Sequence, residues 1–235
     1  MLYLSKRIAF QGSQQSYVGG KPSVPPGTKL PACKLCGQAQ TFMFQVAFSS
    51  GMDWSGKTLS CFACMKCADE RFLIPEMLDN HSQGCNIPAG FLASYDRNFA
   101  FLVFSTSDAK MIKDYDEEVA FFALETESDS THGDFGKIGG IPSWLLEDES
   151  PATYDSTTPM VFLLELMPCI EFTKVEGARP QMELDIFGNP SLSPLGYYQL
   201  FLGNMTYLFG TLGSDSLVAI AQDWRTPEEY FRIFL

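Results

Sequence analysis

The sequence predicts a β-rich α+β fold built from two copies of one β unit. A Gly-Gly-x-Pro-Ser turn occurs at residues 19–23 and returns at residues 139–143. A long apolar segment follows each turn, at residues 42–48 and 161–167, and the two spacings agree to within one residue. A turn and a strand repeated in this way indicate a duplicated unit. The 20 phenylalanines also suit a core of pleated sheets, because aromatic side chains are enriched in strands.

We assign residues 1–107 to the first repeat and residues 108–235 to the second, packed as one compact unit, because no linker separates them. At 235 residues the chain can build a core without disulfide bonds. Residues 125–136 read as an acidic connector, and residues 226–229 form a capping box with proline, which predicts a short C-terminal helix. Strands are predicted over residues 2–10, 41–49, 57–64, 99–104, 119–124, 161–167, 182–187, 197–202, 206–210 and 217–222.

The cysteines give the strongest chemical signal. Cys33 and Cys36 form a C-x-x-C pair that is followed by a glycine and lies between a proline-rich loop and a predicted strand. This pattern is typical of a zinc knuckle, in which two thiolates converge on one tetrahedral ion and the glycine permits the tight turn. Four thiolates around one ion leave no position open for water, so we expect a structural zinc ion.

Two overlapping pairs compete to supply the remaining ligands, Cys61 with Cys64 and Cys64 with Cys67. Residues three apart in an extended strand point to opposite faces, so Cys61 and Cys64 cannot both reach one ion while the strand stays extended. Cys64 and Cys67 lie where that strand ends and can form a second knuckle. We therefore expect Cys61 in the core, although its exchange for Cys64 or Cys67 as a ligand stays open. The predicted ligands are Cys33, Cys36, Cys64 and Cys67.

The net charge of −12 is concentrated in the middle of the chain. Residues 108–155 hold 3 Lys/Arg and 13 Asp/Glu, a net charge of −10, whereas residues 1–107 carry +3. Such a field repels nucleic acid and raises the encounter rate with basic partners, so we expect a basic protein partner and no nucleic acid. The alternative is an acidic loop that only maintains solubility. The residues predicted to contact the partner are Asp114, Asp116, Glu117, Glu118, Trp144, Glu147, Asp148 and Glu149.

The sequence offers little for catalysis. The two histidines, His81 and His132, stand among polar loop residues, and no G-x-S-x-G, H-E-x-x-H or P-loop motif is present. We therefore do not expect an enzyme. No apolar run reaches the roughly 18 residues of a membrane span, and no apolar segment follows Lys6 and Arg7 as in a secretory signal. The expected location is the cytoplasm, with no membrane partner.

The two turns, the strands FMFQVAF and VFLLELM, the strand GKTLSCFAC and the closing strand LVAIAQDW resemble the bacterial YwqG-like proteins. The resemblance covers residues 17–224 and implies a duplicated, β-rich α+β fold. Zinc knuckles mark a subset of that family, so the resemblance also implies a structural metal at the four cysteines. The family brings no established catalytic residues, and none is carried over.

Many bacterial members of that family are presumed immunity proteins, including inhibitors of type VI secreted nucleases. The resemblance therefore implies a cytoplasmic immunity protein that binds and inhibits a cognate toxin, such as a nuclease. The family is also similar to eukaryotic zinc-containing chaperones, which makes a chaperone-like holder of a basic ribosomal protein the first alternative. An RNA-processing or hydrolytic enzyme that uses loop carboxylates is a second alternative, but the sequence lacks histidines or carboxylates at defined ligand spacing.

Overall fold

The computed structural model of the chain describes residues 2–12, 15–67, 83–91, 97–128, 133–184 and 188–222. In this part of the chain the ordered elements are strands and two single-turn 3₁₀ helices, so the protein is β-rich as predicted, and none of these elements is an α-helix. The predicted C-terminal helix and the histidines lie outside the described residues. Within them, no helix is long and apolar enough to cross a membrane.

The elements are β1 (Leu2–Arg7), β2 (Tyr17–Val18), β3 (Ser23–Val24), β4 (Thr41–Ala47), β5 (Lys57–Ala63), β6 (Asn86–Ile87), β7 (Phe99–Ser105), η1 (Thr106–Asp108), β8 (Lys110–Met111), β9 (Phe122–Glu127), β10 (Gly136–Ile138), β11 (Thr153–Tyr154), β12 (Thr158–Leu166), β13 (Phe172–Thr173), β14 (Met182–Leu184), β15 (Pro190–Leu192), β16 (Tyr197–Tyr198), η2 (Phe201–Gly203), β17 (Met205–Thr211) and β18 (Leu217–Gln222).

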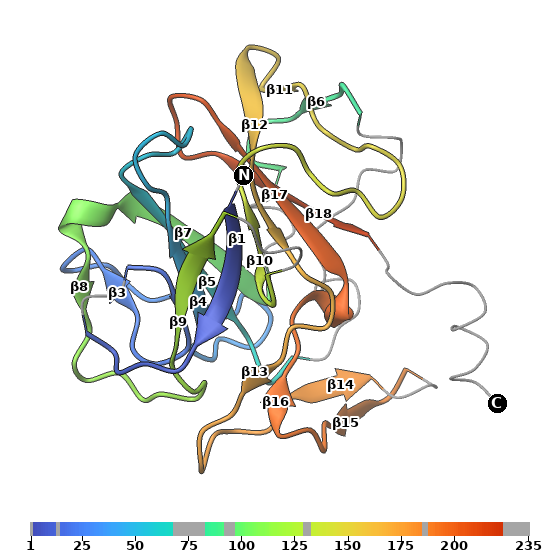
Figure 1. The fold of residues 1–235 in the computed structure, drawn as a ribbon. Helices are drawn as coiled ribbons and strands as arrows, with labels where there is room; N and C mark the ends of the chain where they lie inside the picture. The colour runs from blue at the N-terminus through green and yellow to red at the C-terminus, as the bar shows by residue number, and fades with distance from the viewer. Residues whose placement is uncertain are drawn as a thin grey trace.

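Most strands belong to one large sheet, whose order is β18-β17-β12-β10-β1-β9-β2-β4-β5-β7 (Figure 1). Neighbours along this path are antiparallel. The sheet is mixed because β11 pairs antiparallel with β12 and parallel with β6. Three small two-stranded sheets, β13-β16, β14-β15 and β3-β8, complete the architecture.

The order of the large sheet is matched about its centre, where β1 pairs with β9. Moving outward, β10, β12, β17 and β18 on one side take the places of β2, β4, β5 and β7 on the other. The registers agree as well. Phe122 is the counterpart of Leu2 and Ile138 is the counterpart of Val18, each 120 residues later in the chain. Leu2 opposes Ile138 in the sheet, and Phe122 opposes Val18. The first strand of each half therefore pairs with the other half, which ties the two halves together.

The structure corrects the predicted alignment of the two halves by one residue. The register of β4 and β5 shifts between Phe42 and Phe44, and that of β12 and β17 shifts between Phe162 and Leu164. Phe42 therefore corresponds to Phe162 rather than to Val161, and the offset is again 120 residues. Apolar character cannot distinguish neighbouring residues within a continuous apolar run, whereas the position of a β-bulge does.

Several predicted strands have other bounds in the structure, and the strand expected over residues 2–10 ends at Arg7. Residues 119–124 were expected as one strand, but β9 begins at Phe122, because Val119 bridges to Lys174 before the chain joins the large sheet. Residues 197–202 were expected as a strand, but β16 ends at Tyr198 and η2 follows. The predicted acidic connector at 125–136 is also shorter, since β9 extends into it and β10 begins at its end. Continuous apolar runs report burial, and they do not show where a chain changes partner.

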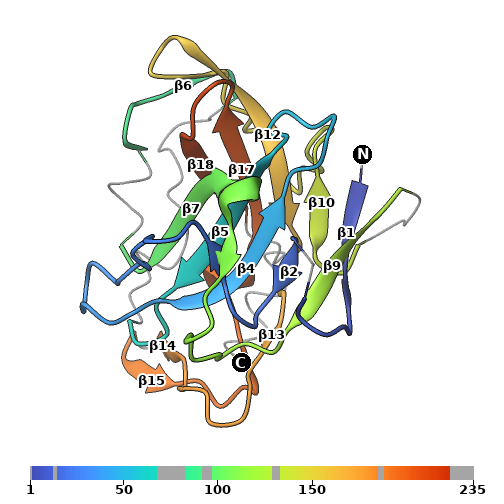
Figure 2. The ribbon, with the colours of Figure 1, turned by 90° about the vertical axis from the view of Figure 1, so that its left-hand side faces the viewer.

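We call β2, β4, β5 and β7 the first wing of the large sheet, and β10, β12, β17 and β18 the second wing. The sheet bends, and the core lies between the two wings. Figure 2 shows β4, β5 and β7 crossing in front of β12, β17 and β18, and the main hydrophobic cluster takes residues from both wings. Trp54, from the connection between β4 and β5, is 2% exposed and packs edge-on against Phe48. Its indole N–H donates to the carbonyl of Thr211 at 3.0 Å, which anchors this first-half loop on the second half.

Replacing Gly210 with alanine is expected to destabilise the fold by about 1–3 kcal/mol, the usual cost of overpacking a core. A Cβ atom at Gly210 would lie 2.3 Å from the Trp54 ring and 2.6 Å from the Leu163 side chain. The matched control is Gly196→Ala, where a Cβ would meet nothing within 4 Å. Urea denaturation measures the free energy of unfolding of both variants. Equal values for the two would show that the wings do not pack closely around Trp54.

Candidate metal centre

The first knuckle is a tight turn fixed by its own backbone. The Cys33 N–H donates to the Gln38 carbonyl and the Gly37 N–H donates back to the Cys33 carbonyl, both at 2.8 Å. Gly37 adopts a φ of +72°, in the left-handed region that glycine enters without strain. The Lys34 N–H donates to the carbonyl of Arg97 at 2.7 Å, which joins the knuckle to the segment before β7.

The second knuckle begins where β5 ends. The Cys64 N–H donates to the Asn98 carbonyl at 2.6 Å, and the chain then bends away so that Cys67 comes back toward the first knuckle. The buried Met65 lies within this bend, and its carbonyl accepts the N–H of Met182, the first residue of β14, at 2.8 Å. The two knuckles are therefore held by neighbouring strands as well as by one another.

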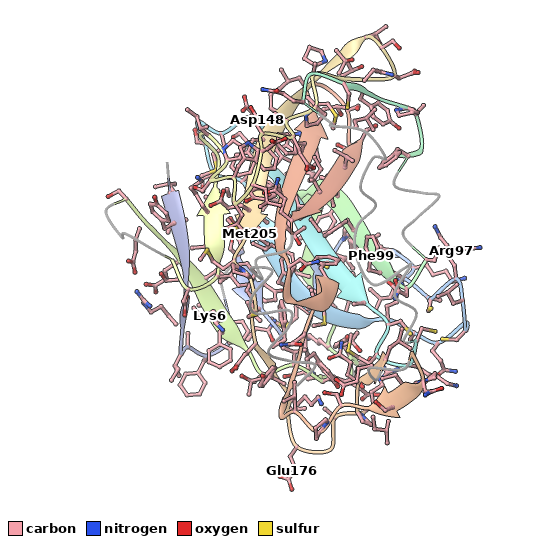
Figure 3. The ribbon with its side chains drawn as sticks, turned by 90° about the vertical axis from the view of Figure 1, so that its right-hand side faces the viewer. Lys6, Arg97, Phe99, Asp148, Glu176 and Met205 are labelled. Carbon is pink, nitrogen blue, oxygen red and sulfur yellow. The ribbon has the colours of Figure 1, made fainter. Side chains whose placement is uncertain are left out.

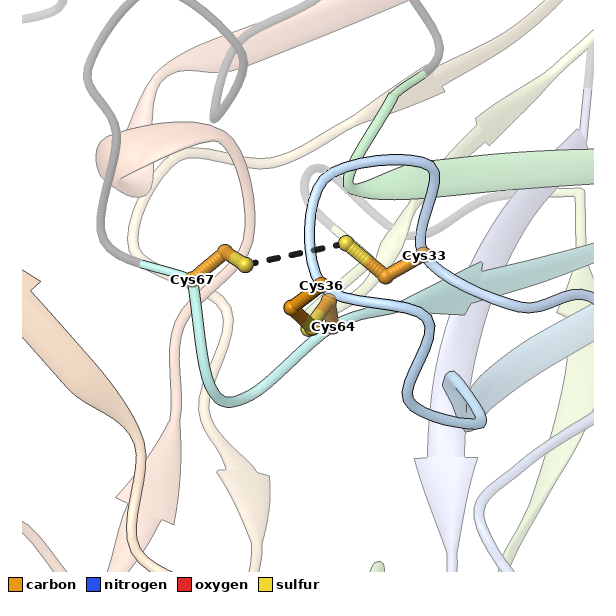
Figure 4. Close-up of side chains that lie close together, drawn as sticks. All are labelled: Cys33, Cys36, Cys64 and Cys67. Carbon is orange, nitrogen blue, oxygen red and sulfur yellow. Dashed lines mark hydrogen bonds between the residues drawn. The ribbon is translucent and has the colours of Figure 1, made fainter.

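The four predicted cysteines converge (Figure 4). Their Sγ atoms all lie within 4.8 Å of one another, and the pairs Cys33–Cys67 and Cys36–Cys64 are each 3.7 Å apart. Zinc–sulfur bonds of about 2.3 Å at tetrahedral angles place the sulfurs about 3.8 Å apart. The cluster can thus bind a metal ion such as zinc. Cys33 and Cys64 are buried, whereas Cys36 and Cys67 are partly exposed.

The thiols of the cluster are not in an ordinary aqueous environment. Burial raises the pKa of Cys64 to about 11 and also raises the pKa of Cys67. Burial acts in the same direction on Cys36, but hydrogen bonds from Gln38 and the neighbouring thiols outweigh it and lower its pKa. Four thiolates this close together repel one another unless a cation lies between them, so the fully charged form of the cluster is unfavourable without a metal.

Cys61 lies away from the cluster. It is fully buried in β5 opposite Phe44 and Phe101, and burial raises its pKa well above the usual value. The alternation of β5 turns Cys61 into the hydrophobic core, as expected from the spacing of residues in a strand. None of the seven cysteines, all of which lie among the described residues, forms a disulfide bond.

The residues predicted to contact a partner fall into two separate groups. Asp114, Asp116 and Glu117 follow β8 and are exposed, whereas Glu147 and Asp148 precede β11 and are exposed there. In Figure 1, β8 lies at the left edge and β11 at the top, so the acidic region does not form one face. Figure 3 shows Asp148 well separated from Arg97, whose carbonyl accepts the N–H of Lys34 in the first knuckle. The acids before β11 therefore do not lie beside the cysteine cluster.

Glu118 and Trp144 are engaged within the protein. The Glu118 side chain is 12% exposed, pairs with Arg179 and accepts the hydroxyl of Thr41. The ring centroid of Trp144 lies 4.2 Å from that of Tyr207 and 5.9 Å from that of Phe209. Trp144 thus anchors its own loop on β17, and Glu149 is only partly exposed in the same loop.

The sequence predicted partner contacts for Trp144 and the acids that follow it, but not for the exposed apolar side chains beside them. We call residues 141–149 the apolar–acidic loop, since Ile141, Leu145 and Leu146 are 75%, 45% and 64% exposed just before the acids. The loop is held through its backbone: Gln222 Oε1 accepts the N–H groups of Leu145 and Leu146, both at 3.1 Å. The Gln222 amide donates in turn to the Glu147 carbonyl at 2.9 Å. The apolar side chains of the loop are therefore presented outward by a fixed main chain.

In the first half, buried polar side chains fix the Gly-Gly turn. The Tyr17 hydroxyl donates to the Lys21 carbonyl and bonds to Ser23 Oγ, both at 2.9 Å. The Ser23 N–H donates to Gln45 Oε1 at 3.2 Å. Burial raises the pKa of Tyr17 to about 12, so the side chain is neutral.

In the second half, 120 residues later, charged side chains make the same contacts. Lys137 Nζ donates to the Ile141 carbonyl at 2.6 Å and to Ser143 Oγ at 2.5 Å, and the Ser143 N–H donates to Glu165 Oε2 at 2.7 Å. Lys137 and Glu165 are 3.4 Å apart, and their side chains are 2% and 4% exposed. Sequence reasoning missed this ion pair, although continuing the repeat at a 120-residue offset aligns Lys137 with Tyr17 and Glu165 with Gln45.

Comparison with known proteins adds no relative. The sequence matches no model of a known protein family, and no similar curated protein is found.

Proposed function

We propose that this chain is a YwqG-like immunity protein, which binds and inhibits a cognate secreted toxin in the cytoplasm. The toxin is inferred to be a basic protein, such as a nuclease delivered by type VI secretion. The observation that carries the proposal is the apolar–acidic loop, which combines three exposed apolar side chains with the acids that follow them. Exposed apolar groups beside charges are typical of protein interfaces, where the apolar groups give affinity and the charges steer encounter.

The four cysteines are inferred to hold one structural zinc ion. A shell of four thiolates leaves no open coordination position, which suits a role in stability rather than in activating water. A cytoplasmic location agrees with this assignment, because thiols stay reduced there and are available to bind metal. The zinc would fasten the loop before β4 to the end of β5 and so support the first wing of the sheet.

The 120-residue offset supports the inference that residues 1–107 and 108–235 arose by duplication of one β unit. The offset holds for the strand registers, for the β-bulges and for the side chains that fix the two Gly-Gly turns. Duplication is also what the YwqG-like resemblance implies. The zinc site of the first half and the apolar–acidic loop of the second half would then have arisen after the duplication.

The test is to capture the tagged protein from its own cells at low and high salt and to identify bound proteins by mass spectrometry. A basic toxin that is released at high salt is the expected result. A basic ribosomal protein would favour the chaperone alternative instead. The absence of any specific partner at low salt would contradict a binding function.

Once a partner is identified, Leu145→Ser combined with Leu146→Ser is expected to weaken its binding about 10–100-fold, because two exposed apolar contacts are lost. The fold should be unaffected, since the loop is anchored by its backbone. The matched control is Asp114→Asn with Asp116→Asn, in the acidic group that lies elsewhere. Titration calorimetry would contradict the proposed surface if the control variant lost more affinity than the loop variant.

A further inference from the structure

A small cavity lies where the second knuckle meets the second half of the chain. Residues 63–65, 98 and 99 form the wall on the side of the first half, and Gln181 and residues 199–201 form the opposite wall. The cavity volume is about 10 Å³. One water molecule needs about 10–15 Å³, so the cavity has room for a single water and for nothing larger.

Hydrogen bonds within each wall hold the two walls in place. On the first wall the Cys64 N–H donates to the carbonyl of Asn98 at 2.6 Å, which joins the end of β5 to the residue before β7. On the opposite wall the Gln181 side-chain amide donates to the Gln199 carbonyl at 2.8 Å, and Gln181 Oε1 accepts the Gln199 N–H at 3.0 Å. Because each wall is fixed by its own bonds, the cavity is part of the fold.

Asn98 brings a buried polar atom to this cavity. The residue lines the cavity and is 3% exposed, and among the described residues its side-chain Oδ1 has no hydrogen-bond partner. Nearly all buried polar atoms in proteins bond to a protein group or to an ordered water, because an unpaired one loses its hydration without compensation. A carbonyl oxygen can only accept, so the partner of Asn98 Oδ1 has to be a donor.

We propose that this cavity binds one water molecule, which donates to Asn98 Oδ1 and bonds to the opposite wall. A buried water needs about two to four polar partners. The carbonyl of Gln181 accepts the Ser193 N–H and that of Gln199 accepts the Gln181 amide, so each keeps a second lone pair for the other O–H of the water. The water therefore links the second knuckle to the second half, and the site depends neither on zinc nor on the identity of a partner.

Water-selective NOE and ROE spectra of the full chain labelled with ¹⁵N test this site directly. Cross-peaks of opposite sign in the two spectra, which mark a bound water, are expected at the side-chain amide of Asn98 and at the Phe99 N–H. None of the lining residues that the structure describes carries a hydroxyl group that could relay such a signal. The exposed Asn86, whose Oδ1 already accepts from Thr153 and Ser156, is the internal comparison and should not give these peaks.

Asn98→Leu keeps the branched shape of the side chain without its acceptor and is expected to lose the water signal at Phe99, whereas Asn86→Leu should retain it. A crystal structure of the unaltered chain should place a water oxygen about 2.5–3.0 Å from Asn98 Oδ1. The proposal is overturned if neither method detects this water, if the Gln199 side chain itself donates to Asn98 Oδ1, or if the signal survives in Asn98→Leu. Thermal melting checks that both variants fold, and if Asn98→Leu does not, the spectra and the crystal of the unaltered chain decide.

Discussion

Removal of zinc by a strong chelator is expected to unfold the first wing of the sheet and to lower the Tm of the protein by at least about 10–20 °C. Zinc bound to four thiolates contributes on the order of 10 kcal/mol or more in small zinc peptides. A loss of only about 5 kcal/mol shifts the Tm of a chain of this size by about 10–20 °C. The effect should be large because the cluster joins the loop before β4, the end of β5 and the segment before β7. Circular dichroism during heating, with and without chelator, measures it.

A variant separates loss of zinc from effects of the chelator. Cys36→Ser is expected to show the low Tm without any chelator, because it removes one ligand of the cluster. Its matched control is Cys169→Ser, which removes an exposed thiol outside the cluster and should retain the original Tm. If the chelator or Cys36→Ser left the melting curve unchanged, zinc would not support the fold.

Lys137→Met is expected to destabilise the protein by about 3–5 kcal/mol, the usual cost of leaving one member of a buried ion pair without its partner. The substitution removes the ammonium that contacts Glu165 and also the donor to the Ile141 carbonyl and Ser143. Glu165 would then be a buried carboxylate with one remaining donor, the Ser143 N–H. Urea denaturation, with the midpoint compared at equal m-values, measures the change.

The first half supplies the compensating double substitution. Lys137→Tyr together with Glu165→Gln reproduces the neutral pair Tyr17 and Gln45, which makes the same contacts 120 residues earlier. We expect the double variant to recover most of the stability lost in Lys137→Met, since no charge is then buried alone. A double variant as unstable as Lys137→Met would show that the two turns are not equivalent.

The cysteine cluster was predictable because its geometry follows from local spacing. Residues three apart in β5 cannot face one ion, so the pair that follows the strand was preferred, and Cys64 and Cys67 do converge with Cys33 and Cys36. The main strands were predictable for the same reason, since alternation within β4 and β5 is a local property. Zinc itself and the partner stay predictions.

The rest depended on contacts between distant segments. The acids are close together in sequence, but the chain crosses the molecule between β8 and β11. The acids that follow β8 and those that precede β11 therefore lie on different parts of the surface. Glu118 was grouped with them, yet it pairs with Arg179, which is 61 residues away. The buried pair of Lys137 and Glu165 contradicts the usual exposure of charged residues, and only the repeat at a 120-residue offset could have indicated it.

Zinc content tests the metal centre most directly. The protein is purified without added metal, and elemental analysis is combined with native mass spectrometry and with titration of reactive thiols. One zinc ion per chain is predicted, lost in Cys36→Ser and retained in Cys169→Ser, with the four clustered thiols protected from reaction until a chelator is added. A chain that carries no metal, and whose clustered thiols react freely in the folded state, would contradict the assignment of a zinc centre.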